Sequence, residues 1–205
     1  MKLTIKHKIC CAIDESNILH EKRFTIVAGM NGVGKSTFTN VLKSNTNKLG
    51  HIIDPDLFAK KYGSQLSGGR EALKDINNCI EHGIAFTEET TLSGRHIISV
   101  IQNAKSHGYT IHLIYIGLDS AQDSIDRVAN RVRNGGHDIP SALISRRYTR
   151  RFDQLAEVLP LCDSADFYDN HNGYTHIAEY SDNEIRQLVS DYPQWMDQFI
   201  QYISE

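Results

Sequence analysis

Short apolar runs alternate with helix-like stretches along most of the chain, and glycine-containing turns separate many of them. The runs predict strands at 24–28, 51–53, 84–88 and 109–116, and apolar residues three or four apart predict helices at 35–44, 70–81, 94–106 and 121–132. Two late strands, at 167–169 and 175–179, and a helical tail over 182–203 follow. Such alternation is typical of parallel strands joined by crossover helices. We therefore expect an α/β fold with a parallel sheet flanked by helices, as a single domain at 24–205. Residues 1–23 lack clear periodicity and are expected to form an N-terminal appendage.

One segment of the chain indicates a chemical function as well as a fold. Residues 29–37 read Gly-Met-Asn-Gly-Val-Gly-Lys-Ser-Thr, the Walker A pattern, with a predicted strand before it and a predicted helix after it. Glycines at Gly29, Gly32 and Gly34 let backbone N–H groups converge on phosphate oxygens, and the helix N-terminus adds positive potential. We expect an ATP site built from Gly29, Asn31, Gly32, Gly34, Lys35, Ser36 and Thr37. In it Lys35 reaches the β- and γ-phosphates and Ser36 binds Mg²⁺. The fold is thus expected to be that of a P-loop NTPase or kinase.

A second glycine-containing segment, residues 66–70, reads Leu-Ser-Gly-Gly-Arg and resembles the signature of ABC transporter ATPases. It follows the Walker A segment by only about thirty residues, and no apolar run ending in Asp-Glu comes after it. A loop with a helix beginning at residues 68–71 is the better interpretation.

Acidic residues follow two of the predicted strands. Asp54 and Asp56 come directly after 51–53, and Glu89 and Thr91 stand at the end of the third strand. The carboxyl ends of parallel strands face the same crevice as the phosphate loop. Phosphoryl transfer to a hydroxyl needs a carboxylate that orients and deprotonates the acceptor. This edge of the sheet is therefore the candidate site of chemistry.

The net charge of −3 conceals an uneven distribution. Residues 127–151 hold seven arginines and one acid, a charge of +6, whereas residues 152–205 sum to −10 and residues 1–126 to +1. The arginines stand on two predicted helices separated by Asn-Gly-Gly at 134–136. Helices joined by a glycine hinge are typical of a lid that closes over a transferring phosphoryl group. A solvated basic face or a nucleic-acid patch is the alternative. Binding to nucleic acid is disfavoured because aromatic residues are not interleaved and the acidic segment would repel a polyanion.

Composition excludes several classes of protein. The chain is 40% hydrophobic and 23% charged, as in ordinary globular domains, and no apolar run approaches the about 18 residues of a membrane span. No export signal is recognisable at the N-terminus. The four cysteines (Cys10, Cys11, Cys79 and Cys162) lack metal-ligand spacing, and the histidines show no ligand-pair motif. Free thiols fit a reducing compartment, so we expect a cytoplasmic protein without a membrane partner.

Together these segments resemble the zeta-toxin family of P-loop kinases, especially its short bacterial branch. The resemblance covers roughly residues 25–150 in the family's order. It rests on the Walker A segment, Ile-Asp-Pro-Asp at 53–56, Glu-Glu-Thr-Thr-Leu-Ser-Gly at 88–94, Gly-Gly-His-Asp-Ile-Pro at 135–140 and Arg-Arg-Tyr at 146–148.

The resemblance implies an ATP-dependent kinase that phosphorylates a UDP-linked amino sugar and that an antitoxin protein blocks. It gives Asp56 the role of the catalytic aspartate, with Asp54, Glu89 and Thr91 toward the substrate. Two lid arginines in the family lie 13 residues apart, and Arg133 with Arg146 reproduces that spacing. Arg131 and Arg147 compete for the same role.

Two classes of function therefore fit the sequence. One is a small-molecule kinase acting as the toxin of a toxin–antitoxin pair. The other is a nucleotide-dependent ATPase or switch protein that signals to a partner and has no small-molecule acceptor.

Overall fold

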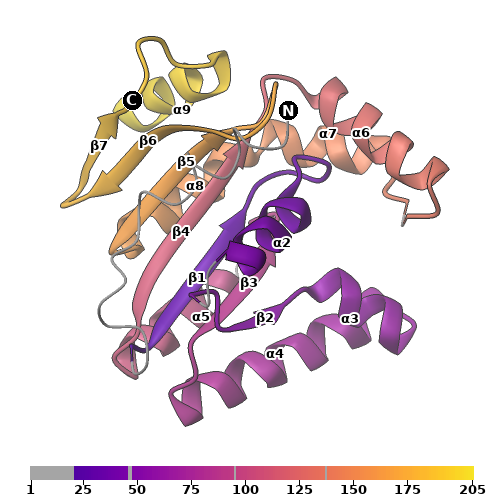
Figure 1. Ribbon diagram of the computed structural model, residues 1–205, viewed down its shortest axis with the longest axis vertical. Coiled ribbons are helices and arrows are strands. Elements are labelled where there is room, and N and C mark those ends of the chain that lie inside the picture. The colour runs from indigo at the N-terminus through magenta and orange to yellow at the C-terminus, as the bar shows by residue number, and fades with distance from the viewer. Residues whose placement is uncertain (1–20, 46–47, 95, 137) are drawn as a thin grey trace.

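A single mixed sheet organises the chain (Figure 1). The computed structural model describes residues 21–45, 48–94, 96–136 and 138–205, and within them seven strands follow the spatial order β2-β3-β1-β4-β5-β6-β7. Their bounds are β1 Arg23–Ala28, β2 His51–Ile53, β3 Phe86–Thr90, β4 Thr110–Gly117, β5 Ser164–Asp169, β6 Thr175–Ser181 and β7 Glu184–Gln187. β1 to β5 pair in parallel, and β6 and β7 add antiparallel strands at one edge.

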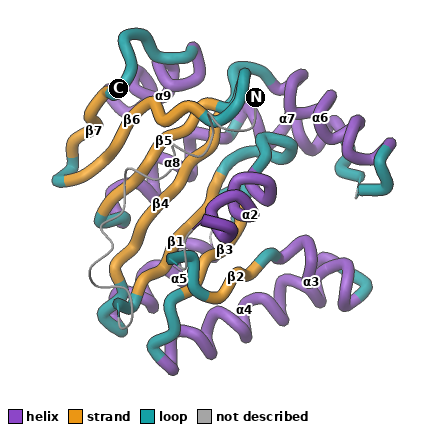
Figure 2. Tube along the Cα trace, in the orientation of Figure 1, coloured by secondary structure: helices purple, strands orange, loops and turns teal. Residues whose placement is uncertain are grey.

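Helices lie on both faces of this sheet (Figure 2). Their bounds are α2 Lys35–Asn45, α3 Pro55–Tyr62, α4 Gln65–His82, α5 His96–Ser106, α6 Ala121–Arg133, α7 Ser141–Thr149, α8 Arg151–Val158 and α9 Gln194–Ser204, with a short 3₁₀ turn at Leu159–Leu161. α4, α5, α8 and α9 contribute to one hydrophobic core, and α2 to the core on the opposite face. The α/β fold predicted from the sequence is confirmed.

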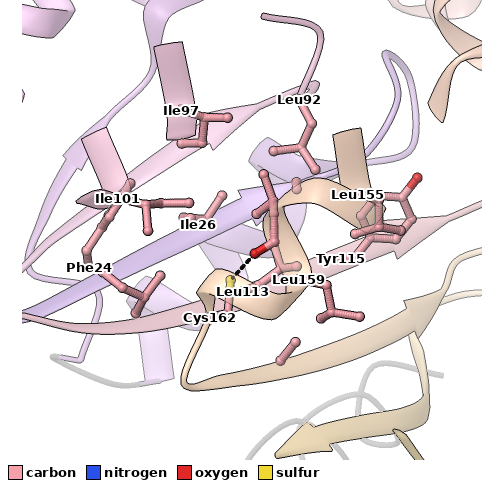
Figure 3. Close-up of a cluster of buried hydrophobic side chains, with 14 of the residues drawn as sticks. Phe24, Ile26, Leu92, Ile97, Ile101, Leu113, Tyr115, Leu155, Leu159 and Cys162 are labelled. Carbon is pink, nitrogen blue, oxygen red and sulfur yellow. Dashed lines mark hydrogen bonds between the residues drawn. The ribbon is translucent and has the colours of Figure 1, made fainter. Parts of the chain in front are cut away.

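The strands of the sheet alternate between these two cores, as the two-residue period of a strand requires. Leu113 and Tyr115 of β4 point to the larger core, where they pack with Phe24, Leu155 and other buried side chains (Figure 3). Ile114 and Ile116 belong instead to the core beneath α2. β1, β3 and β4 are therefore held rigidly, and their carboxyl ends form a fixed platform for the loops that follow.

The helices after β2 differ from the prediction. Asp54 caps α3 by accepting the N–H of Asp56, and Pro55 occupies the first turn, so the Asp-Pro pair begins a helix that the sequence analysis left out. Residues 66–70, expected as a loop with a helix beginning at 68–71, lie inside α4. Gly68 lets α3 and α4 pack closely, because a Cβ there would lie 2.3 Å from the Ala59 nitrogen. Gly68 therefore serves helix packing, whereas Gly69 faces open space.

The third strand lies two residues later than expected, at 86–90 in place of 84–88. Every residue of β3 is buried, and the shift places Glu89 in the strand beside Glu88. Tyr109 explains the shift, since its hydroxyl donates to the carbonyls of Cys79 and Ile84 and fixes the preceding turn.

The expected helical tail over 182–203 is wrong in its first half. Asp182 and Asn183 both have positive φ (53° and 64°) and form the tight turn of a β6–β7 hairpin, a conformation that Asn and Asp tolerate better than most residues. The tail becomes helical only at Gln194. The acidic segment after residue 152 therefore completes the sheet and its covering helices. Residues 1–20 lie outside the described part of the chain, and the appendage stays a prediction.

Candidate functional site

A cavity of about 520 Å³ opens where the carboxyl ends of β1, β2 and β3 meet α6 and α7. Most of the site residues expected from the sequence line it: Asn31, Gly32, Gly34, Lys35, Ser36, Thr37, Asp54, Asp56, Glu89, Thr91, Arg131 and Arg147. Gly29, Arg133 and Arg146 do not. The fold thus brings into one cavity groups that are far apart in the sequence.

The loop between β1 and α2 has the backbone geometry that phosphate binding needs. Gly34 adopts φ +98°, and a Cβ there would lie 2.5 Å from the hydroxyl oxygen of Tyr174. Lys35 is the first residue of α2, and its ammonium group donates to the carbonyls of Gly29 (3.0 Å) and Met30 (3.1 Å). The loop, the helix N-terminus and the lysine together form an anion-binding cradle.

Lys35 is the electrostatic centre of the cavity. Burial lowers its pKa from 10.5 to about 8, while Glu89, Asp56 and Asp54 oppose the shift. A triphosphate placed beside the ammonium group would supply further negative charge and favour the protonated form.

Ser36 and Glu89 form a pair of oxygen donors beside the lysine. The Ser36 hydroxyl donates to Oε2 of Glu89 at 2.7 Å, and burial raises the pKa of the Glu89 carboxyl. Hydroxyl and carboxylate oxygens at the entrance to a P-loop helix are ligands that suit Mg²⁺. The residues present therefore fit a nucleotide-bound magnesium ion, and Glu89 lies near the end of its strand beside the phosphate loop, as expected from the sequence.

Two aspartates approach from the beginning of α3. Asp54 accepts the N–H of Asp56 at 2.9 Å as the helix N-cap, and its pKa is raised mainly by burial. The Asp56 side chain caps no backbone N–H in the described contacts. Its negative charge raises the pKa of both Lys35 and Arg147 and so opposes the effect of burial. One oxygen of Asp54 is thus engaged by the helix cap, and both carboxylates line the cavity.

The arginine-bearing helices form a small layer of their own over the cavity. Val128, Ile139 and Ile144 pack α6 against α7 and the segment between them. Arg147 of α7 donates to Oδ1 of Asn31 in the phosphate loop at 2.7 Å, which ties this layer to the loop. Burial lowers the pKa of Arg147, and the guanidinium remains charged at neutral pH.

The candidate arginines divide into two groups. Arg131 and Arg147 line the cavity, whereas Arg133 is exposed and bonds to the side chain of Asn130 in its own helix. Arg146 lines a second cavity of about 430 Å³ with Arg150, on the other side of the loop after β3. Thr91, Ser93 and Arg147 line both cavities. Spacing in the sequence favoured Arg133 with Arg146, but helix rotation turns each of them away from the phosphate loop.

Residues after β5 support the phosphate loop, and the sequence analysis missed them. The Asn170 amide donates to the Val33 carbonyl at 2.7 Å, and the Tyr174 hydroxyl donates to the Gly34 carbonyl at 2.6 Å. Arg127 of α6 donates in turn to the Asn170 carbonyl. These partners lie more than 130 residues from the loop, so no local signal announces them.

Glu88 and His96 form a further polar pair at the cavity wall that the sequence did not single out. His96 Nε2 and Glu88 Oε1 lie 3.1 Å apart, and this contact raises the pKa of the histidine. Because Glu88 is almost fully buried, the pair anchors the loop after β3 to that strand.

Comparison with solved structures agrees with the fold. A chain from the PezAT chromosomal toxin–antitoxin system of Streptococcus pneumoniae superposes with a TM-score of 0.63 at 14% identity, covering 95% of this chain and 88% of that one. The AvrRxo1-ORF1:-ORF2 structure with ATP gives 0.63 at 14% identity, covering 89% of this chain and 64% of that one. A putative kinase from Chloroflexus aurantiacus gives 0.51 at 16% identity, over 63% of this chain and 80% of that one. The chain therefore has the fold of the zeta-toxin-like P-loop kinases.

Sequence comparison gives a closer relationship. An uncharacterised protein of Haemophilus influenzae is 34% identical over 126 residues, which span 58% of this chain and 88% of that protein. The chain belongs to the same family as this Haemophilus protein. No family model matches the sequence.

Two further expectations from the sequence concern cysteine pairing and membrane spans. Cys79 and Cys162 are buried and unpaired, while Cys10 and Cys11 lie outside the described residues. None of the helices in the described ranges has the length and apolar character needed to cross a membrane.

Proposed function

We propose that this protein is an ATP-dependent phosphotransferase of the zeta-toxin type, which moves the γ-phosphate of ATP to a hydroxyl of a small molecule. One observation carries the proposal: Lys35, Asp56, Arg131 and Arg147, from four separate helices, line the same cavity as the phosphate loop. A phosphate cradle, a carboxylate and cations beyond it are the parts that in-line phosphoryl transfer uses.

Each part has a role that follows from its position. The loop N–H groups and Lys35 hold the β- and γ-phosphates, and Ser36 with Glu89 would hold Mg²⁺, which neutralises phosphate charge when it is bound. Asp56 accepts the proton of the acceptor hydroxyl as that oxygen attacks the γ-phosphorus. Arg131 and Arg147 stabilise the charge spread over the transferring group.

The acceptor enters, in this proposal, from the second cavity. Thr91, Ser93 and Arg147 line both cavities, so a molecule bound beside Arg146 and Arg150 lies next to the γ-phosphate site. Two residues that line the second cavity, Arg151 and Gln154, each have one buried polar atom (Nε and Oε1) without a hydrogen-bond partner among the described residues. Arginines suit an acceptor that carries phosphate, as a UDP-linked amino sugar does.

The comparisons with solved structures support the further proposal that the protein is the toxin of a toxin–antitoxin pair. The structures that superpose over most of this chain include one from a toxin–antitoxin system and one of a two-protein complex with ATP. We propose an antitoxin protein as the partner. Expression of the chain should arrest growth, and Lys35→Ala should relieve the arrest.

The decisive experiment is a transfer screen. The purified protein, ATP and Mg²⁺ are incubated with nucleotide sugars and with a metabolite extract, and mass spectrometry detects any compound that gains one phosphate. A phosphorylated product that depends on Lys35 supports the kinase. ATP hydrolysis without any phosphorylated compound would instead support a nucleotide-dependent switch, the alternative that the Arg147–Asn31 link between α7 and the loop also fits.

A further inference from the structure

A second group of chemically reactive side chains lies on the sheet away from both cavities. Asp166 of β5 faces His176 and Glu179 of β6, and one ligand-type atom from each of the three lies within 4.8 Å of the others. His112 of β4 approaches the same aspartate from the neighbouring strand. None of these four residues lines either cavity.

The strand register explains how these residues meet. Asp166 stands opposite Glu179 in the antiparallel β5–β6 pair, and a bulge between Phe167 and Tyr168 brings His176 to the same face. His112 has the same parity along β4 as Ile114 and Ile116, whose side chains point toward α2. The group therefore lies on the α2 face of the sheet, toward the amino-terminal end of β4.

The two histidines lie within ion-pairing distance of the carboxylate. Nε2 of His176 lies 2.9 Å from Oδ1 of Asp166, and Nε2 of His112 lies 3.3 Å from Oδ2. Both Nε2 atoms are buried, yet neither makes a hydrogen bond to any described residue. These two buried ring nitrogens therefore lack the well-aligned hydrogen bond that buried polar groups normally have.

Other contacts prepare the group to bind a cation. Nδ1 of His112 lies 2.8 Å from the Ser164 hydroxyl, and donation by that hydroxyl leaves the ring proton on Nε2, beside Asp166. The His176 ring stacks on Tyr168 with centroids 4.7 Å apart, which fixes its plane. Asp166 is buried and stands opposite Glu179 in the β5–β6 pair, so the two carboxylates share one face of the sheet. One carboxylate oxygen of Glu179 accepts a hydrogen bond from Arg186, and the other is left for a metal ion.

We propose that Asp166, His176 and Glu179 bind a divalent transition-metal ion, with zinc as the best match, and that His112 positions Asp166. Imidazole and carboxylate ligands suit zinc, and tetrahedral ligands about 2.0–2.1 Å from the ion stand roughly 3.3 Å apart, within the 4.8 Å limit that the three residues satisfy. Two carboxylates and one arginine leave a net negative charge for the ion to balance. The ion would link β5 to β6, where the parallel sheet turns antiparallel. This proposed metal site does not depend on the proposed kinase activity.

A second group in the described residues offers a matched control. His51, Asp75 and Cys79 satisfy the same distance limit. There, however, Nε2 of His51 lies within hydrogen-bonding distance of Asp75, 2.8 Å away, and burial raises the pKa of the Cys79 thiol to about 11, which disfavours the thiolate that binds metal.

The test measures metal binding by the full-length, tag-free protein. Metal-free wild type, His176→Gln, Ser164→Ala and the control His51→Gln are dialysed against micromolar Zn²⁺ with excess Mg²⁺ to occupy hard oxygen sites. Bound zinc is measured by mass spectrometry, Co²⁺ spectra report ligand type and geometry, and thermal melts compare each variant with and without zinc.

We expect one zinc per chain in wild type and in His51→Gln, a zinc-dependent rise in Tm, and Co²⁺ bands of a tetrahedral site without thiolate charge transfer. His176→Gln should lose binding, and Ser164→Ala should weaken it about 10- to 100-fold, because Ser164 holds His112, which positions the ligand Asp166. If His176→Gln does not fold, Glu179→Gln replaces it. The proposal is overturned if wild type binds no zinc, if the ligand variants bind as wild type does, or if Co²⁺ shows thiolate ligation.

Discussion

Replacing Lys35 by methionine should stabilise the protein while removing nucleotide binding. Burial lowers the Lys35 pKa from 10.5 to about 8, so at pH 7 the folded protein holds a charge that its environment disfavours. A shift of about 2.5 pKa units corresponds to about 3 kcal/mol of lost stability. Methionine has a similar length and no charge, so it avoids this loss of stability. Part of the stability gained is offset because two hydrogen bonds to the loop carbonyls are lost. We expect Lys35→Met to raise the free energy of unfolding by about 1–3 kcal/mol at pH 7.

The sign of the pH dependence follows from the same shift. Because the folded-state pKa lies below the unfolded one, the penalty is fully present below pH 8 and fades as pH rises from 8 to 10.5. By pH 9.5 about 1 kcal/mol of it should remain, so the advantage of the variant shrinks by about 2 kcal/mol.

Urea unfolding at pH 7 and pH 9.5 measures both quantities, and calorimetry with ATP confirms that binding is lost. Lys43→Met, an exposed lysine in the last turn of the same helix, is the control and should change stability by less than about 0.5 kcal/mol. A Lys35→Met variant that is no more stable than Lys43→Met at pH 7 would refute the electrostatic reasoning.

Three other changes test separate parts of the structure. Gly68→Ala should destabilise the protein by about 1–3 kcal/mol because its Cβ meets the backbone of Ala59, whereas Gly69→Ala, with open space around it, should be neutral or stabilising by up to about 1 kcal/mol; equal thermal melts would contradict the packing explanation. Arg146→Ala should raise the KM for the acceptor at least about tenfold and leave ATP affinity unchanged; a loss of ATP affinity would place this arginine in the nucleotide site instead. Glu89→Gln should raise the Mg²⁺ concentration needed for half-maximal transfer by about tenfold, and an unchanged Mg²⁺ dependence would remove Glu89 from the metal site.

The fold was predictable where the signal is local. Alternating apolar runs located the central strands, because buried parallel strands read as short continuous hydrophobic segments. The Walker A segment was predictable for the same reason, since its glycines, lysine and serine are consecutive and the flanking strand and helix are strongly patterned. The hairpin turn at Asp182-Asn183 was missed, although Asp and Asn with positive φ are a known hairpin signal.

The arginines show why the rest of the site could not be predicted. Spacing along the chain placed Arg133 and Arg146 together, but which side of a helix faces the cavity depends on how α6 and α7 pack through Val128 and Ile144. That packing turns Arg131 and Arg147 toward the phosphate loop. The brace from Asn170 and Tyr174 depends in the same way on tertiary structure, because β5 and β6 bring these residues to the loop.

The central claim is that Asp56 activates an acceptor hydroxyl beside a P-loop that binds ATP. The most direct measurement compares phosphate transfer and ATP affinity in Asp56→Asn with those of the wild type and of Asp191→Asn, which removes the same charge from an exposed loop distant in sequence from the site. The account predicts that Asp56→Asn lowers the rate of transfer at least about 100-fold, as expected for a lost general base, with ATP affinity nearly unchanged, and that Asp191→Asn behaves as wild type. Transfer at the wild-type rate by Asp56→Asn would contradict the account.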